Sequence, residues 1–64
     1  MKRRDLLKHL RDNGCEFDHA GGNHDLWLNP ITNQRAPVER HREIPNTLAL
    51  EICKQLSIPK PRKK

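Results

Sequence analysis

Residues 20–28 hold the side chains of this chain that are best suited to chemistry. Two adjacent glycines, Gly21 and Gly22, come just before His24, and the chain's one tryptophan, Trp27, follows three residues later. A histidine side chain titrates near pH 6.5, so it can donate or accept a proton at neutral pH. Adjacent glycines are typical of a tight hairpin turn, where positive φ angles are needed, and they leave room for another backbone to approach. A strand histidine that only satisfies a hydrogen bond is the alternative that spacing alone leaves open.

The chain is strongly basic for its size. Lysine and arginine number 13 against 8 aspartate and glutamate residues, which gives a formal net charge of +5 and a pI near 9.8. This excess favours nucleic acid or an acidic protein as partner, and a soluble domain that is merely basic is the alternative. No apolar run approaches the roughly 20 residues of a membrane span, and Asp5 and Lys8 interrupt the segment where a signal peptide would be apolar. We therefore expect a cytoplasmic protein without a membrane partner.

With 64 residues, of which 33% are apolar, the chain is expected to form one small domain. Cys15 and Cys53 occupy apolar positions and are expected to be buried thiols rather than a disulfide. His19 and His24 are five residues apart, but no cysteine or second histidine pair supports a zinc site, so no metal and no cofactor is expected. The expected core consists of Leu6, Leu7, Leu10, Cys15, Phe17, Leu26, Leu28, Val38, Ile44, Leu48, Ile52, Cys53 and Leu56.

The N-terminal segment predicts a helix over residues 3–13. A stripe of leucines marks its buried face, and Gly14 supplies the left-handed conformation that commonly follows a helix. Arg4, Lys8 and Arg11 fall at i, i+4 and i+7 on an adjacent face. We interpret this basic row as a phosphate-contacting face; a solvated helix face is the alternative.

Three short strands are predicted next. Residues 15–19 alternate apolar and polar side chains, the pattern of a strand with one buried face. Residues 23–29 form the second strand after the glycine turn, and residues 35–40 form the third. Pro37 lacks an N–H group, which indicates an edge strand or a bulge.

The second strand has apolar side chains on both faces. We expect Leu26 and Leu28 to point into the core and Trp27 to point the opposite way. By the same parity His24 falls on the side of Leu26, at the mouth of the strand.

A second helix is predicted over residues 46–57, with Asn46 or Thr47 as its N-cap. The fold class is therefore α+β, in the order α-β-β-β-α, with a three-stranded antiparallel sheet and both helices on one face, as in double-stranded-RNA-binding domains. Residues 1–58 form the single domain, and residues 59–64 form a basic, proline-containing tail.

Five segments of the chain, taken in order, resemble a known protein family. They are Gly-Cys-Glu at 14–16, Gly-Gly-Asn-His at 21–24, Trp-Leu-Asn at 27–29, Arg-His-Arg-Glu-Ile at 40–44 and Ile-Cys-Lys-Gln-Leu-Ser-Ile-Pro at 52–59. Together they resemble the HicA-type toxins, the small messenger-RNA interferases of bacterial HicA/HicB toxin–antitoxin pairs. The most diagnostic piece is Gly22-Asn23-His24, and the resemblance covers nearly the whole chain.

The resemblance implies an endoribonuclease that acts independently of the ribosome and uses one catalytic histidine, here His24. RNA carries its own nucleophile in the 2′-OH group, so an acid–base side chain can promote cleavage without a metal ion. The implied partners are single-stranded messenger RNA and a HicB-like antitoxin that covers the active face, with DNA contacted only through the antitoxin complex. The expected RNA contacts are Arg4, Lys8, Arg11, Gly22, Asn23 and Arg40.

Two other functions remain open at this point. One is a non-catalytic RNA-binding module that inhibits translation by occupancy, and the other is an interaction protein that binds an acidic partner. Trp27, if it faced solvent, could stack an RNA base, worth ~1–3 kcal/mol. His9 and His41 are expected to be structural, with a supporting role open to His41.

Overall fold

Helices and strands follow one another in the predicted order. The structure is a computed structural model and describes residues 1–61 of the chain. The elements are α1 (Arg3–Asp12), β1 (Glu16–Ala20), β2 (His24–Asn29), β3 (Gln34–Glu39) and α2 (Asn46–Gln55). The predicted α-β-β-β-α order is therefore confirmed.

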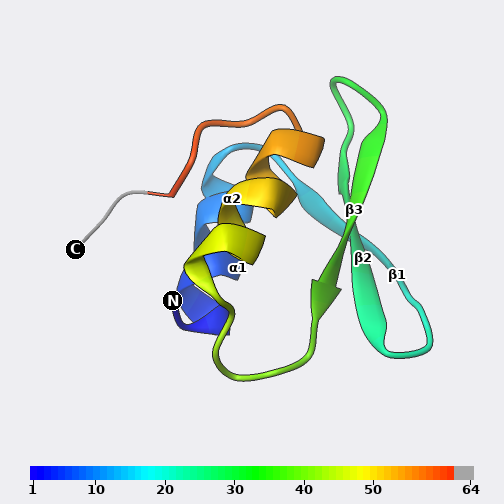
Figure 1. Cartoon of the computed structure of the whole chain (residues 1–64). Helices are drawn as coiled ribbons and strands as arrows, with labels where there is room; N and C mark the ends of the chain where they lie inside the picture. The colour runs from blue at the N-terminus through cyan, green and yellow to red at the C-terminus, as the bar shows by residue number, and fades with distance from the viewer. Residues whose placement is uncertain (62–64) are drawn as a thin grey trace.

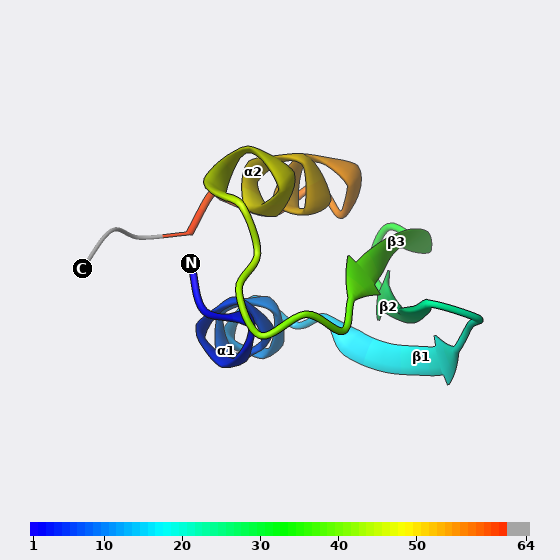
Figure 2. The same cartoon turned by 60° about the horizontal axis from the view of Figure 1, so that its bottom comes forward.

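The three strands form one antiparallel sheet in the order β1-β2-β3. Trp27 of the central strand lies opposite Phe17 on one side and opposite Ala36 on the other. Both helices lie on the same side of this sheet, and no helix of the described chain covers its other face (Figures 1 and 2). β3 is an edge strand, which confirms the prediction made from Pro37.

The core fills the space between the helices and the covered face. Of the expected core members, Leu7 and Leu48 are only partly buried and pack against its border. Trp27, Ala36 and Ala49 belong to the core although they were not expected there. The expected members that are buried are Leu6, Leu10, Cys15, Val38, Ile44, Ile52, Cys53 and Leu56.

The predicted faces of β2 are wrong. Trp27 and Asn29 are each only 4% exposed, whereas Leu26 and Leu28 are partly buried on the uncovered face. Residues 26–28 are all apolar, so the alternation of side chains does not determine which face of β2 is buried. Polar contacts on the side covered by the helices determine it. Asn29 Nδ2 donates to the Leu56 carbonyl at 2.7 Å in the interior. Because alternate side chains share a face, this contact places Trp27 in the core as well.

Phe17 was expected in the core and is 52% exposed. The register of β1 against β2 shifts between Phe17 and His19, which is the mark of a bulge in this edge strand. Phe17 therefore reaches only the border of the core, where its ring meets the Trp27 ring edge-on with 6.3 Å between centroids.

The helix ends follow the predicted signals in part. Gly14 has φ of +87°, the left-handed conformation expected after α1. The predicted capping of α2 is wrong, because Pro45 occupies the N-cap position and the helix has no side-chain cap. α2 also ends at Gln55, and Ser57 beyond it takes a positive φ of 58°.

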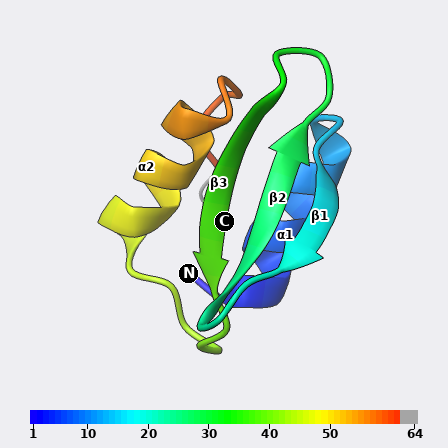
Figure 3. The ribbon, with the colours of Figure 1, turned by 90° about the vertical axis from the view of Figure 1, so that its right-hand side faces the viewer.

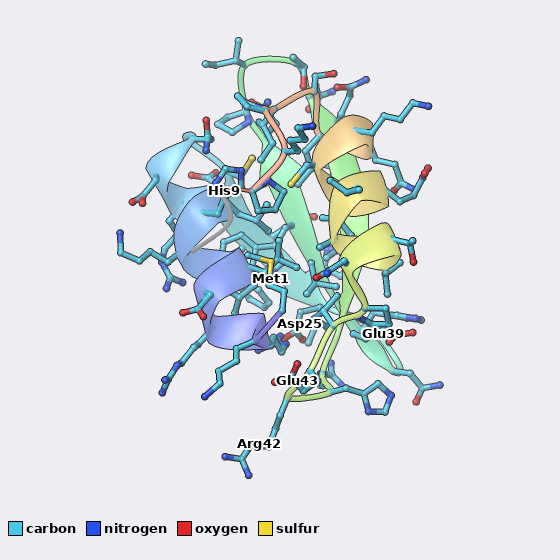
Figure 4. The ribbon with its side chains drawn as sticks, turned by 60° about the vertical axis from the view of Figure 1, so that its left-hand side comes forward. Met1, His9, Asp25, Glu39, Arg42 and Glu43 are labelled. Carbon is cyan, nitrogen blue, oxygen red and sulfur yellow. The ribbon has the colours of Figure 1, made fainter. Side chains whose placement is uncertain are left out.

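The segment after α2 folds back onto α1. His9 Nε2 donates to the Pro59 carbonyl at 2.7 Å, and Figure 4 shows His9 facing this segment. Residues 59–61 of the predicted tail are thus described, whereas residues 62–64 lie outside the described residues. In residues 1–61 no helix has the length and apolar character needed to cross a membrane.

Candidate functional site

Three segments meet at one end of the molecule: the start of α1, the hairpin between β1 and β2, and the connection from β3 to α2 (Figure 3). The antiparallel topology causes this, because β1 and β3 both end where β2 begins. The Arg3 N–H donates to the Arg42 carbonyl at 2.8 Å, and Lys2 forms a bridge with Glu43. These contacts fix α1 to the connection.

His24 is the first residue of β2 and lies opposite Glu39 of β3. It lines an open hollow of about 450 Å³ together with Asn23, Glu39, Arg40 and His41. The structure thus brings together three of the residues predicted for the site and adds Glu39 and His41. Two imidazoles, a carboxylate and a guanidinium around one hollow form a set that can transfer protons and hold negative charge.

Arg40 holds the hairpin that carries His24. Its guanidinium donates to the carbonyl oxygens of Gly22, Gly21 and His24, at 2.9, 3.0 and 3.2 Å, while Nε donates to Asp25 at 3.0 Å. A guanidinium has five N–H donors, so most of them are satisfied within the protein. The RNA contact predicted for Arg40 stays a prediction, and the structure adds a positioning role.

Gly21 is required in the hairpin for space rather than for its backbone angles. Neither Gly21 nor Gly22 has a positive φ, so the expectation of positive φ in this turn is wrong. The Gly21 N–H donates to the His24 carbonyl at 2.7 Å, and a Cβ added at Gly21 would lie 3.1 Å from that oxygen. A Cβ at Gly22 would meet nothing within 4 Å.

Asp25 joins three elements beneath the hairpin. Its carboxylate accepts from Arg40 Nε at 3.0 Å and from Arg3 Nη2 at 2.8 Å, and Arg3 Nε also donates to the Glu39 carbonyl at 2.7 Å. The hydrogen bond from Arg40, supported by the charges of both arginines, lowers the pKa of Asp25. Neither Asp25 nor Arg3 could be identified from the sequence, because no local pattern connects residues 22 positions apart.

A second hollow, of about 610 Å³, is strongly basic. It is lined by Lys2, Arg3, Arg4, Leu7, Arg40, Arg42 and Glu43. Arg40 borders both this basic hollow and the His24 hollow, so the two are neighbours. Figure 4 shows Arg42 and Glu43 at the same end of the molecule as Asp25 and Glu39. Lys2 and Arg42 were not predicted as site residues.

The predicted basic row on α1 is divided in the structure. Arg4 lines the basic hollow, but Lys8 and Arg11 line neither hollow. Lys8 forms an ion pair with Asp12 at 2.8 Å, and the Arg11 guanidinium lies over the Trp27 ring, 5.8 Å from its centroid. Since Trp27 is buried, it has no free face on which an RNA base can stack.

Other titratable groups lie apart from the two hollows. His19 Nδ1 and Arg35 Nε both donate to Asp18 Oδ2, at 2.7 and 3.0 Å, and these hydrogen bonds lower the pKa of Asp18. Both cysteines are free and buried. Within the described part of the chain, no three His, Cys, Asp or Glu side chains form a group that could hold a metal ion.

Comparison with known proteins gives one match. The family model described as HicA toxin of bacterial toxin-antitoxin matches residues 3–58, which is most of the chain. Searches of curated proteins and of solved structures found no match.

Proposed function

The chain belongs to the family of HicA toxins of bacterial toxin–antitoxin systems, and we propose that it is an endoribonuclease that cleaves messenger RNA at His24. The observation that carries the proposal is that His24 lines an open hollow with Asn23, Arg40 and His41, next to a basic hollow. The hollow leaves the imidazole accessible to a substrate, and the surrounding positive charge attracts a phosphodiester.

The proposed reaction is an internal transfer at phosphorus. The substrate's 2′-OH loses its proton as its oxygen bonds to phosphorus, the bond from phosphorus to the 5′ oxygen breaks, and that oxygen gains a proton. The products are a 2′,3′-cyclic phosphate and a free 5′-hydroxyl. His24 serves as the base or as the acid, and the nucleophile comes from the RNA, so the reaction needs no metal ion.

Two groups in the hollow can supply the second proton transfer. His41 and Glu39 both line it with His24, and one of them would complete an acid–base pair. The pH–rate profile separates them, because His41→Gln abolishes one limb of a bell-shaped profile if His41 is the partner and leaves both limbs if it is not.

The rest of the site holds the reacting groups in place. The contacts of Arg40 with three hairpin carbonyls fix the start of β2, and Asp25 fixes Arg40 in turn. This arrangement fixes the position of His24 before RNA binds. A catalytic group that is already in position raises the rate of the reaction. Cations nearby that have no partner among residues 1–61, including Arg4, neutralise the charge that develops on the phosphate.

The test compares the purified protein with His24→Ala on an end-labelled single-stranded RNA. We expect cleavage to 2′,3′-cyclic phosphate ends, a loss of about 10²–10⁴-fold in the variant, and no effect of EDTA. His19→Ala is the matched control, because His19 is exposed, bonds to Asp18 and lines neither hollow. An active His24→Ala variant with the same ends would refute the catalytic assignment.

The basic hollow also favours a second candidate function, an RNA-binding module that blocks translation without cleaving. In that case both proteins would retain RNA with a steep salt dependence, and neither would produce cyclic phosphate ends.

The proposed protein partner is a HicB-like antitoxin that covers the His24 hollow. Co-expression with the neighbouring reading frame should yield a complex that no longer cleaves RNA. A complex with undiminished cleavage would place the antitoxin elsewhere on the surface.

A further inference from the structure

We propose that the basic hollow binds the sugar–phosphate backbone of the RNA strand next to the bond cleaved at His24, through Lys2 and Arg42 as well as Arg4. The proposal rests on the proposed function for the position of the cleaved bond. It extends that function to a second site and assigns two residues that sequence analysis did not find.

The cations of the basic hollow fall into two groups. Arg3 and Arg40 are engaged with Asp25 and with backbone carbonyls. The side chains of Lys2, Arg4 and Arg42 have no carboxylate within ion-pair distance and no hydrogen bond among residues 1–61. All three are exposed. The first group builds the hollow, and the second is left free to bind an anion.

Among the described residues Glu43 is the one acidic residue that lines the basic hollow. Its Oε1 lies 3.5 Å from the N-terminal ammonium of Met1, which offsets its charge. Three unpaired cations therefore dominate the hollow. With Leu7 as its apolar member and no aromatic side chain, the hollow suits phosphates rather than stacked bases.

The position of the basic hollow favours RNA over an acidic protein. The hollow shares Arg40 with the hollow that holds His24, so a strand whose scissile phosphate lies at His24 reaches it directly. The sugar–phosphate backbone of RNA carries one negative charge per nucleotide. A strand of several nucleotides is long enough to occupy two neighbouring hollows. Affinity should therefore depend on these cations more strongly when the RNA is long enough to enter both hollows at once.

The test measures binding in a His24→Ala background, so that cleavage is not required for the result. Lys2→Gln/Arg42→Gln removes two charges from the hollow, and Lys54→Gln/Lys60→Gln removes two exposed charges on and after the C-terminal end of α2. Binding of a labelled oligouridylate of about 12 nucleotides is followed by fluorescence anisotropy over a range of salt concentrations. Circular dichroism confirms that both variants are folded.

We expect the salt slope to fall by about 1.4 for Lys2→Gln/Arg42→Gln, because each phosphate contact on a single strand contributes about 0.7. If the two double variants bind the RNA equally at 1 M salt, a difference of about 1.4 in salt slope corresponds to about 25-fold weaker binding at 0.1 M salt. An oligonucleotide of about 3 nucleotides occupies one hollow at a time, so the two variants should differ less on it than on the long RNA.

Equal slopes for the two double variants on the long RNA would overturn the proposal. So would an equal loss on the short RNA, because the hollow would then not act as a separate site. Competition by poly-glutamate at matched charge, as strong as competition by the RNA, would assign the hollow to an acidic protein instead. A failure of cleavage with this binding pattern intact would refute the proposed function and leave the hollow as a binding site for the RNA backbone.

Discussion

Asn29 joins the sheet to the end of α2, and its removal should destabilise the domain severely. Its Nδ2 donates to the Leu56 carbonyl at 2.7 Å, and its Oδ1 accepts the Ile31 N–H at 3.0 Å. Asn29 is 4% exposed and Leu56 is fully buried, so in Asn29→Ala the carbonyl oxygen loses its donor where water does not reach it. An unsatisfied buried acceptor costs about 1–3 kcal/mol. Ile31 is 86% exposed, so water replaces its lost acceptor at little cost.

The expected loss for Asn29→Ala is therefore about 1–3 kcal/mol. A domain of this length has a free energy of unfolding of only about 3–10 kcal/mol, and the melting temperature should fall by about 4–24 °C. Urea denaturation followed by Trp27 fluorescence measures this directly, since Trp27 is the chain's one tryptophan and is buried. Gln55→Ala is the control, because this exposed amide should change stability by less than about 0.5 kcal/mol.

Asn29→Asp tests the direction of the hydrogen bond. In Asn29→Asp the carboxylate still accepts from the Ile31 N–H, but its other oxygen faces the Leu56 carbonyl and cannot donate to it. At pH 7 this variant should therefore be at least as unstable as Asn29→Ala. Burial and the carbonyl raise the pKa of the introduced group above about 3.9, its unfolded value. The protonated group can donate to Leu56, so its stabilisation is complete below the unfolded pKa and is lost as pH rises through the folded pKa. A pH-independent penalty, or an Asn29→Ala loss below about 0.5 kcal/mol, would refute the reasoning.

Three further predictions concern the hairpin and the core. Arg40→Lys keeps the charge but loses the fork that contacts three hairpin carbonyls, so kcat for RNA cleavage should fall by about 10²-fold with KM little changed. A raised KM with kcat unchanged would instead indicate a role in RNA binding. Gly21→Ala should lower the free energy of unfolding, measured by urea denaturation, by about 1 kcal/mol through the contact with the His24 carbonyl, whereas Gly22→Ala, which meets open space, should not. Burial, and secondarily Cys15, raises the pKa of Cys53 to about 11 from 9.0, so stability should fall by about 2 kcal/mol as pH rises from 9 to 11. Cys53→Ala should remove most of this alkaline loss, and an unchanged loss would contradict its origin.

The fold could be predicted because its signals are local. Leucine spacing and Gly14 determine α1, and the Gly21-Gly22 pair determines the hairpin that follows β1. The edge position of β3 followed from Pro37, whose missing N–H makes a central strand unfavourable. Each of these inferences needs only a few neighbouring residues.

The face of β2 could not be predicted, because the information lies elsewhere in the chain. Leu26, Trp27 and Leu28 are all apolar, so their alternation is uninformative. The orientation follows from the partners of the polar residues on either side, Asp25 with Arg3 and Asn29 with Leu56. The segment of α1 that binds Asp25 and the turn that binds Asn29 come from opposite ends of the chain.

The residues that line the candidate site could be predicted in part, and the contacts that support them could not. The glycine–histidine turn marked His24 and Asn23, and the structure adds His41 and Glu39 to the same hollow. The contacts of Arg40 with the hairpin could not be foreseen, because an arginine next to a predicted strand end is equally suited to an RNA phosphate and to a carbonyl.

Both edges of the sheet carry a backbone irregularity, and this bears on how the protein behaves at high concentration. The bulge between Phe17 and His19 interrupts β1, and Pro37 removes a donor from β3. An open strand edge is a template for pairing with another chain, and bulges and prolines are the usual means of preventing it. Both open edges of the sheet therefore disfavour edge-to-edge pairing with a second chain, although no helix of residues 1–61 covers one of its faces.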